Sequence, residues 1–344
     1  MYRHLLVPID GTELSNETIG QAVEFARVLG ARITFFHAVE DHTSLTFGQG
    51  EVARAAAPDE CVYAGESRAR ELLVKAESAA RACGVPCSSA STVNNTAHAA
   101  IIAAARDAGS DLIFMASHGR RSRVGMMLGS QTLKVLTGAG IPVLVCATRE
   151  PPVQPRAIGI IRGEHRSLAA VLHATMHLLD TAMRNGTAPD GASLRAAMRY
   201  IKSFPVALHH PKEELLLFRK LRERTSVLDA ELDELDRQHH RDRELTAELA
   251  VLVERCLDAT APSAAKATTD LEQALARYAT FMWEHLGREE GVILPAAQRH
   301  LKPEDWAEID AAFSANQDPC FDARTESEYR QLFSRIMSLA ASWS

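Results

Sequence analysis

A proline-rich segment separates two stretches of this chain whose hydrophobic patterns differ. Pro151, Pro152 and Pro155 fall within five positions, and proline neither donates a backbone hydrogen bond nor fits the interior of a helix. We therefore predict a semi-rigid linker at 148–157. It leaves residues 1–147 and 158–344 as two domains, each long enough for a core of its own.

Before the linker, short apolar runs alternate with stretches of helical periodicity. Glycine follows several helical stretches, at Gly30, Gly84 and Gly109, where it favours helix termination. Strands that alternate with helices indicate βα units and a Rossmann-like, mostly parallel sheet of five strands. The expected strands are 4–9, 32–39, 87–93, 111–116 and 141–146, and the expected helices are 17–29, 66–83, 97–108 and 131–137.

After the linker, strand patterns vanish and apolar residues recur at helical spacing. Four long stretches of this kind predict a four-helix bundle, and shorter helices are expected at 303–313 and 326–339. The predicted fold class is therefore α/β plus all-α, with a parallel sheet domain followed by a helical bundle and extra C-terminal helices.

The composition argues against several classes of protein. Apolar residues make up 46% and charged residues 24% of the chain, as in globular domains, and the net charge of −6 argues against a nucleic-acid partner. We expect no membrane span, because no apolar run reaches about 18 residues, and the N-terminus does not resemble a secretory signal. Six scattered cysteines are expected to be reduced thiols in a cytoplasmic protein.

A histidine–glutamate motif occurs twice in the second domain. His209 precedes Glu213 by four residues, and His285 precedes Glu289 by four. On a helix this spacing places both side chains of a pair on one face, and imidazole with carboxylate is a ligand set for iron, zinc or manganese. Two copies on two helices predict a shared polynuclear site inside the bundle, although the same spacing also suits a salt bridge on an exposed helix face.

Three histidines take the place of apolar residues on helical stripes that should face the bundle core. A buried histidine needs hydrogen-bond partners and a buried glutamate needs a counter-charge, and a pair of divalent cations would supply that charge. The histidines on the stripes are His165, His239 and His285. The predicted metal ligands are His165, His209, Glu213, His239, His285 and Glu289.

Two pairs of adjacent histidines leave the ligand set ambiguous. His209 keeps the four-residue spacing to its glutamate and matches the second copy, whereas His210 keeps that spacing to the following glutamate. His239 fits its apolar stripe better than His240 does. Pro211 removes one backbone donor and should kink the second helix, which could change the histidine that points inward.

With these motifs, residues from about 158 to 300 resemble the hemerythrin-like (HHE) cation-binding four-helix bundles. The resemblance implies two iron ions in a non-haem centre, with Glu213 and Glu289 bridging them and the histidines as terminal ligands. Hemerythrin has a further histidine in its third helix where this chain has Arg243, so either one iron has an open position or another residue such as His173 replaces it. The matching segments are Glu164-His165-Arg166, His209-His210-Pro211-Lys212-Glu213-Glu214, Gln238-His239, and His285-x-x-x-Glu289-Glu290 with Leu294-Pro295.

A glycine motif follows the expected strand 111–116 in the first domain. Gly119 is separated by nine residues from Gly129 and Ser130, which precede a helix. Glycine permits close approach of the backbone to a phosphate, and amides at a helix N-terminus attract anions. Ligands of parallel sheets also bind outside the carboxyl ends of the strands. The motif therefore indicates a phosphate site, although the glycines could serve only as turn residues.

This glycine motif, with Val7-Pro8-Ile9-Asp10, His37-Ala38-Val39 and Ile141-Pro142-Val143-Leu144-Val145, makes residues 1–147 resemble a universal stress protein domain. The resemblance implies binding of ATP or AMP and a homodimer formed through this domain. The family motif has a glycine where this chain has Ala116, so a non-binding dimerisation module is the alternative. The implied nucleotide contacts are Asp10 near the adenine or ribose, Val39 against the base, and Gly119, Gly129 and Ser130 on phosphate.

Together these features predict a cytosolic stress-response protein that senses or binds O2, NO or peroxide at a di-iron centre and binds a nucleotide. Two alternatives remain open: a di-iron enzyme that reduces peroxide or NO or repairs iron centres, and a metal-free interaction module. No nucleophile–base arrangement of a hydrolase is present, so no residue is assigned a catalytic role.

Overall fold

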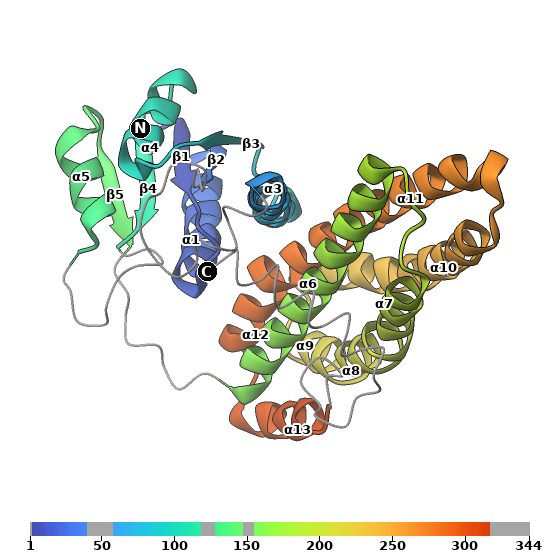
Figure 1. Ribbon diagram of the computed structural model, residues 1–344. Coiled ribbons are helices and arrows are strands. Elements are labelled where there is room, and N and C mark those ends of the chain that lie inside the picture. The colour runs from blue at the N-terminus through green and yellow to red at the C-terminus, as the bar shows by residue number, and fades with distance from the viewer. Residues whose placement is uncertain (1, 40–57, 118–127, 147–154, 317–344) are drawn as a thin grey trace. The chain divides into compact units, whose positions relative to one another are not determined.

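The computed structural model describes residues 2–39, 58–117, 128–146 and 155–316. They form a parallel α/β part and, beyond residue 154, a helical part, which confirms the fold class predicted from the sequence (Figure 1). Across these ranges, no helix combines the length and the apolar character that crossing a lipid bilayer requires.

Five parallel strands form the sheet, in the order β3-β2-β1-β4-β5. The central strand β1 pairs with β2 on one side and with β4 on the other, so that Leu5 lies opposite both Ile33 and Leu112. The chain order reverses between β1 and β4, and ligands of such sheets bind beyond the carboxyl ends of these strands. The strands are β1 (His4–Pro8), β2 (Arg32–Val39), β3 (Cys87–Val93), β4 (Leu112–Ala116) and β5 (Val143–Cys146).

Helix α1 (Glu13–Leu29) begins at Glu13 rather than at Glu17 because Thr12 caps its N-terminus. The Thr12 hydroxyl accepts a hydrogen bond of 3.2 Å from the Ser15 amide. The helix ends at Gly30, whose φ of 64° is a conformation that glycine adopts readily. The remaining helices of the α/β part are α3 (Pro58–Ala82), α4 (Ala97–Asp107) and α5 (Ser130–Gly138).

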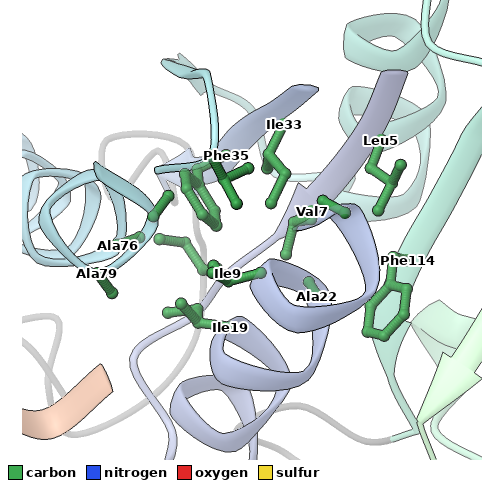
Figure 2. Close-up of a cluster of buried hydrophobic side chains, with 14 of the residues drawn as sticks. Leu5, Val7, Ile9, Ile19, Ala22, Ile33, Phe35, Ala76, Ala79 and Phe114 are labelled. Carbon is green, nitrogen blue, oxygen red and sulfur yellow. The ribbon is translucent and has the colours of Figure 1, made fainter. Parts of the chain in front are cut away.

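Side chains alternate between the two faces of the sheet, and each face has its own hydrophobic core. Leu5, Val7 and Phe35 pack with residues of α1 and α3 (Figure 2). Leu6 and Phe36 pack on the opposite face with residues of α4 and α5. Because helices cover both faces, the inner strand β4 is apolar throughout, as buried parallel strands usually are, whereas the edge strand β3 is rich in serine and mostly exposed.

The helical part consists of four long helical stretches followed by a shorter helix, α13 (Figure 1). The first stretch is α6 (Arg156–Asn185) and the third is α10 (Asp229–Asp258), each an unbroken helix. The second stretch is α7 (Gly191–Ser203), η1 (Pro205–His209), α8 (His210–Lys212), η2 (Glu213–Phe218) and α9 (Arg219–Arg224), and the fourth is α11 (Ala261–Arg288), η3 (Glu289–Ile293) and α12 (Leu294–His300). In the fourth stretch, His285 lies near the end of α11 and Glu289 begins η3, which follows α11 directly.

The elements η1, η2 and η3 are π-helical turns, in which an amide bonds to the carbonyl five residues earlier. In η1 the His209 amide donates to the Phe204 carbonyl at 3.1 Å, and the His210 amide donates to the Pro205 carbonyl. Pro211, where a kink was expected, lies in a short α-helical segment, α8, between two π-helical turns. Such turns are frequent at functional sites.

The histidines expected on apolar stripes are buried, which confirms that these stripes face the interior. On α6 the buried positions include Ile161, His165 and Leu168, at intervals of four and three residues. On α10 the buried stripe contains His239 and, three residues later, Asp242. Polar residues at core positions of two helices need partners inside the bundle.

Helix α13 (Pro303–Ser314) matches the helix expected at 303–313, whereas the helix expected at 326–339 lies outside the described residues. Ionic contacts join α13 to α9, because Arg224 donates hydrogen bonds of 2.8 and 2.9 Å to the two carboxylate oxygens of Asp305. At the same end of α13, Asp305 also accepts the backbone amide of Lys302 at 3.0 Å. These bonds with Arg224 are the main reason that the pKa of Asp305 lies below its ordinary value.

Replacing Asp305 by asparagine should weaken the docking of α13 by about 1–3 kcal/mol, because a charge-assisted pair is lost. Since the folded-state pKa is depressed, this contribution is present above the unfolded pKa of about 3.9 and is lost as the pH falls below it. Urea titration with hydrogen exchange in α13 should show a deficit for D305N at pH 7 that shrinks at pH 3. The exposed neighbour Glu304 provides the control E304Q, and equal stability of D305N and wild type at pH 7 would contradict the prediction.

Candidate metal centre

Seven buried side chains of the helical part form two groups with the spacing of metal ligands. Within each group, one ligand atom from every residue lies within 4.8 Å of the others. Glu213 belongs to both groups, and all seven side chains belong to residues that are at most 3% exposed. The first group is His165, His209, Glu213 and Glu289, and the second group is His210, Glu213, His239 and His285.

The two oxygens of Glu213 face different groups. In the first group, Glu213 Oε1 lies 3.1 Å from His209 Nε2, which is 3.2 Å from His165 Nε2. In the second group, Glu213 Oε2 lies 3.6 Å from His239 Nε2. Around a metal ion with bonds of about 2.0–2.2 Å, adjacent ligand atoms are separated by about 3 Å and opposite ones by about 4 Å. The spacing therefore suits a carboxylate that bridges two ions.

The donor atoms of the two groups suit such ions. Glu213 Oε2 is buried and accepts no hydrogen bond from any residue that the structure describes. A buried carboxylate oxygen in that state is costly unless a cation neutralises it. The donors are imidazole nitrogens and carboxylate oxygens, which suit iron, zinc or manganese. The residues present therefore fit a pair of divalent cations.

Carboxylates also hold the outer ring nitrogens of two histidines. Glu164 Oε2 accepts the Nδ1 proton of His209 at 2.5 Å, and Glu214 Oε1 accepts that of His239 at 2.8 Å. Both bonds leave Nε2, the nitrogen that faces the group, as the ligand atom. A carboxylate in this position fixes the tautomer and ring orientation of a metal-binding histidine and raises its basicity.

His210 has a comparable neighbour on α10. Its Nδ1 lies 3.4 Å from Oδ2 of the buried Asp242, and the other carboxylate oxygen accepts a hydrogen bond of 3.2 Å from the Thr246 hydroxyl. Burial is the main reason that the pKa of Asp242 lies above its ordinary value. The buried polar residues Asp242 and Thr246 of α10 thus have partners inside the bundle: Asp242 lies beside His210, and Thr246 bonds to Asp242.

Charge attraction outweighs burial at the centre of the first group. Burial disfavours the charged form of His209, but the carboxylates of Glu213 and Glu164 raise its pKa to about 10. Burial likewise disfavours the charged form of Glu213, yet His209 and His239 hold its pKa well below the ordinary value. Glu213 therefore retains a negative charge that either a proton on histidine or a metal ion can balance.

All six predicted metal ligands come together, and the structure adds His210. The four-residue spacing to Glu213 favoured His209 over His210, but both are buried, one in each group. On an α-helix, adjacent side chains point about 100° apart, so the periodicity favoured one inward-facing histidine of the two. The π-helical turn η1, which immediately precedes α8, could not be read from the sequence. His240 is exposed, in keeping with the stripe that favoured His239.

Arg243, the residue at the position of the missing histidine, points toward a carboxylate. Its Nη1 lies 3.8 Å from Glu214 Oε1, and its side chain is 39% exposed. His173 is buried but belongs to neither group of described residues. The fifth imidazole therefore comes from His210, next to a ligand already predicted, rather than from His173.

In the α/β part, the predicted nucleotide contacts that the structure describes follow the carboxyl ends of strands or begin a helix. Asp10 follows β1, and its carboxylate accepts hydrogen bonds from the Thr12 amide at 3.0 Å and hydroxyl at 2.7 Å. Val39 ends β2 and is buried. Gly129 precedes α5 with no side-chain cap, and Ser130 is the exposed first residue of that helix.

These positions match the edge where the sheet's strand order reverses, but one predicted contact residue is not described. Gly119 lies outside the described residues. The Gly129 amide donates a hydrogen bond of 2.9 Å to the Ser117 carbonyl, so the turn before α5 is tied to the end of β4. An uncapped helix N-terminus offers amides to an anion, while the contacts that Gly119 was expected to make stay a prediction.

Comparison with protein families assigns both parts. Residues 1–147 match the universal stress protein family, and residues 156–297 match the hemerythrin HHE cation binding domain. The chain therefore carries a universal stress protein domain followed by a hemerythrin HHE domain. A search of curated proteins finds no match.

Several solved structures similar to this chain are universal stress proteins, and each aligns with less than half of it. That from Archaeoglobus fulgidus is 19% identical, with a TM-score of 0.31 over 42% of this chain and 93% of its own. UspA from Lactobacillus plantarum is 19% identical, with a TM-score of 0.33 over 42% and 97%. A universal stress protein in complex with cAMP is 20% identical, with a TM-score of 0.32 over 43% and 99%.

Because Glu213 belongs to both groups, replacing it by alanine should abolish binding of both metal ions, whereas His165→Ala should weaken mainly the first group. Metal per chain, measured by elemental analysis after anaerobic loading with ferrous iron and desalting, should fall close to zero in E213A. His240→Ala changes the exposed neighbour of His239 and should bind as wild type does. Retention of both ions by E213A would rule out a bridging role.

Proposed function

We propose that this chain is a cytosolic stress-response protein with a di-iron centre in its helical part and a nucleotide site in its α/β part. The centre would sense or bind O2, NO or peroxide. The single observation that carries the proposal is the buried carboxylate of Glu213, whose two oxygens face two different sets of imidazoles. Neither a purely hydrogen-bonded core nor a salt bridge on the surface requires a buried carboxylate between two sets of imidazoles.

The protein's own residues would hold the ions and keep water away from them. Imidazole and carboxylate are ligands that iron accepts, and the two carboxylates would balance only part of the charge of two iron ions, which leaves a site able to attract a small oxidant. One ion would be held by His165, His209 and Glu289 together with the shared Glu213. The other ion would be held by the three histidines of the second group together with Glu213. The full burial of these side chains restricts the partner to a molecule of a few atoms.

The enzyme alternative rests on an imbalance between the two groups. The second group contains three imidazoles, whereas the first contains two imidazoles and two carboxylates. Each group, with Glu213 counted in both, offers four donor residues, and non-haem iron(II) sites keep further positions open for an external ligand; the alternative places that open position at the first group, which has one imidazole fewer. Reduction of peroxide or NO, or repair of iron centres, would use that position repeatedly, while a sensor or carrier would bind its ligand there reversibly.

Metal content and absorption in air and after reduction test the proposal and separate these alternatives. We expect two iron ions per chain and near-ultraviolet bands that disappear on reduction. A stable adduct after mixing the ferrous protein with O2 or NO supports binding, and repeated turnover supports an enzyme. Absence of bound metal, with a melting temperature that chelators do not change, would support the metal-free interaction module instead.

The nucleotide site is proposed at the carboxyl edge of the sheet, with ATP or AMP as ligand and a homodimer formed through this domain. Its support is the family match of residues 1–147 together with the position of Asp10 after β1 and of Gly129 and Ser130 at the N-terminus of α5. Asp10 would contact the adenosine moiety, Val39 the base, and the turn around Gly129 the phosphates.

Asp10→Ala should lower ATP affinity at least several-fold, because it removes a carboxylate at the edge of the site. Loss of the Asp10–Thr12 bonds could also perturb α1. Ser130→Ala therefore tests the site independently, because it changes an exposed residue at the N-terminus of α5. Isothermal titration of the full chain with ATP and with AMP measures both. Asp107→Ala, at a surface position whose side chain is 73% exposed, is the control; wild-type affinity in both site variants would reject this location.

A further inference from the structure

Helix α13 lies beyond the segment matched by the HHE domain, yet it contacts a residue of the candidate metal centre. The family match ends at residue 297, and α13 spans Pro303–Ser314. Phe313, which is fully buried, meets the ring of His209 edge-on with centroids 5.9 Å apart. One wall of the first group is thus built by a helix that the domain match does not include.

A polar chain also runs from the end of α13 to His209. Asn316 Nδ2 donates a hydrogen bond of 2.8 Å to Glu164 Oε1, and Glu164 Oε2 accepts the Nδ1 proton of His209 at 2.5 Å. Glu164 is 6% exposed. The two oxygens of one buried carboxylate therefore connect the end of α13 to an imidazole of the first group.

The orientation of the Asn316 amide is set from its other side. Lys212 Nζ donates a hydrogen bond to Asn316 Oδ1, and a second one of 2.8 Å to the Ala312 carbonyl. With Oδ1 turned toward Lys212, the NH2 group faces Glu164. Because Lys212 is next to Glu213 in the chain, the same short segment holds both the end of α13 and the shared ligand.

We propose that Asn316 and Glu164 are positioning residues of the metal centre, so that the docking of α13 tunes the position held by His165 and His209. This inference rests on the proposed metal site. A carboxylate on the outer nitrogen makes imidazole a stronger donor, which tightens metal binding and favours the more oxidised ion. Asn316 keeps Glu164 in the place where it can do so.

The test compares four full-length variants loaded with ferrous iron: Glu164→Gln, Asn316→Ala, Asn316→Asp and Ser314→Ala. E164Q keeps an acceptor but removes the charge, N316A removes the amide, and N316D keeps its shape but replaces the donor with an anion. S314A changes an exposed residue at the same end of α13 and is the matched control. Iron affinity by chelator competition and the midpoint potential are measured, and urea titration of the metal-free proteins shows whether each variant folds.

E164Q and both Asn316 variants should bind iron about 10-fold or more weakly and have a higher midpoint potential, while S314A behaves as wild type. Wild-type affinity and potential in folded N316A and N316D would overturn the role of α13, even if E164Q is impaired. Equal losses in S314A would show a general effect of loosening the helix and would also overturn it. Wild-type protein that binds no iron would instead refute the proposed function, and this inference with it.

Discussion

The burial of negative charge inside the helical part is the constraint on which the rest of that structure depends. Glu213 and Glu289 are each 1% exposed, and an unneutralised carboxylate in such a place would destabilise the fold by several kcal/mol. Imidazoles surround the central carboxylate of Glu213, and the outer carboxylates of Glu164 and Glu214 in turn accept hydrogen bonds from two of these imidazoles. Apolar stripes position the four stretches, but the charge requirement explains which stripe positions are not apolar.

The fold was largely predictable because its signals are local. Alternating strands and helices defined the parallel sheet, and helical stripes placed His165, His239 and His285 inside the helical part. Helix boundaries were less predictable: α1 starts at Glu13 because a single threonine hydroxyl caps it. That cap is a short-range effect of one side chain, which hydrophobic periodicity cannot register.

The candidate site was predictable except where the backbone departs from the α-helix. Stripe arguments assume 3.6 residues per turn, whereas the adjacent His209 and His210, both buried, lie where the π-helical turn η1 meets α8. Pro211 was the available signal, since it removes a backbone donor, but it indicated a kink without showing its form. Outer partners such as Glu164 and Asn316 are 152 positions apart, beyond the reach of any local pattern.

The π-helical turns have a consequence for how a site of this kind can be varied. A π turn fits one additional residue into a helical turn. The second helical stretch, which contains η1, supplies two buried imidazoles, His209 and His210, so no further helix is needed to supply the second one. The number of residues between Phe204 and Glu213 then matters as much as their identity. Changing the length of this segment by one residue would rotate the histidines away from their partners, and no choice of side chains could restore them.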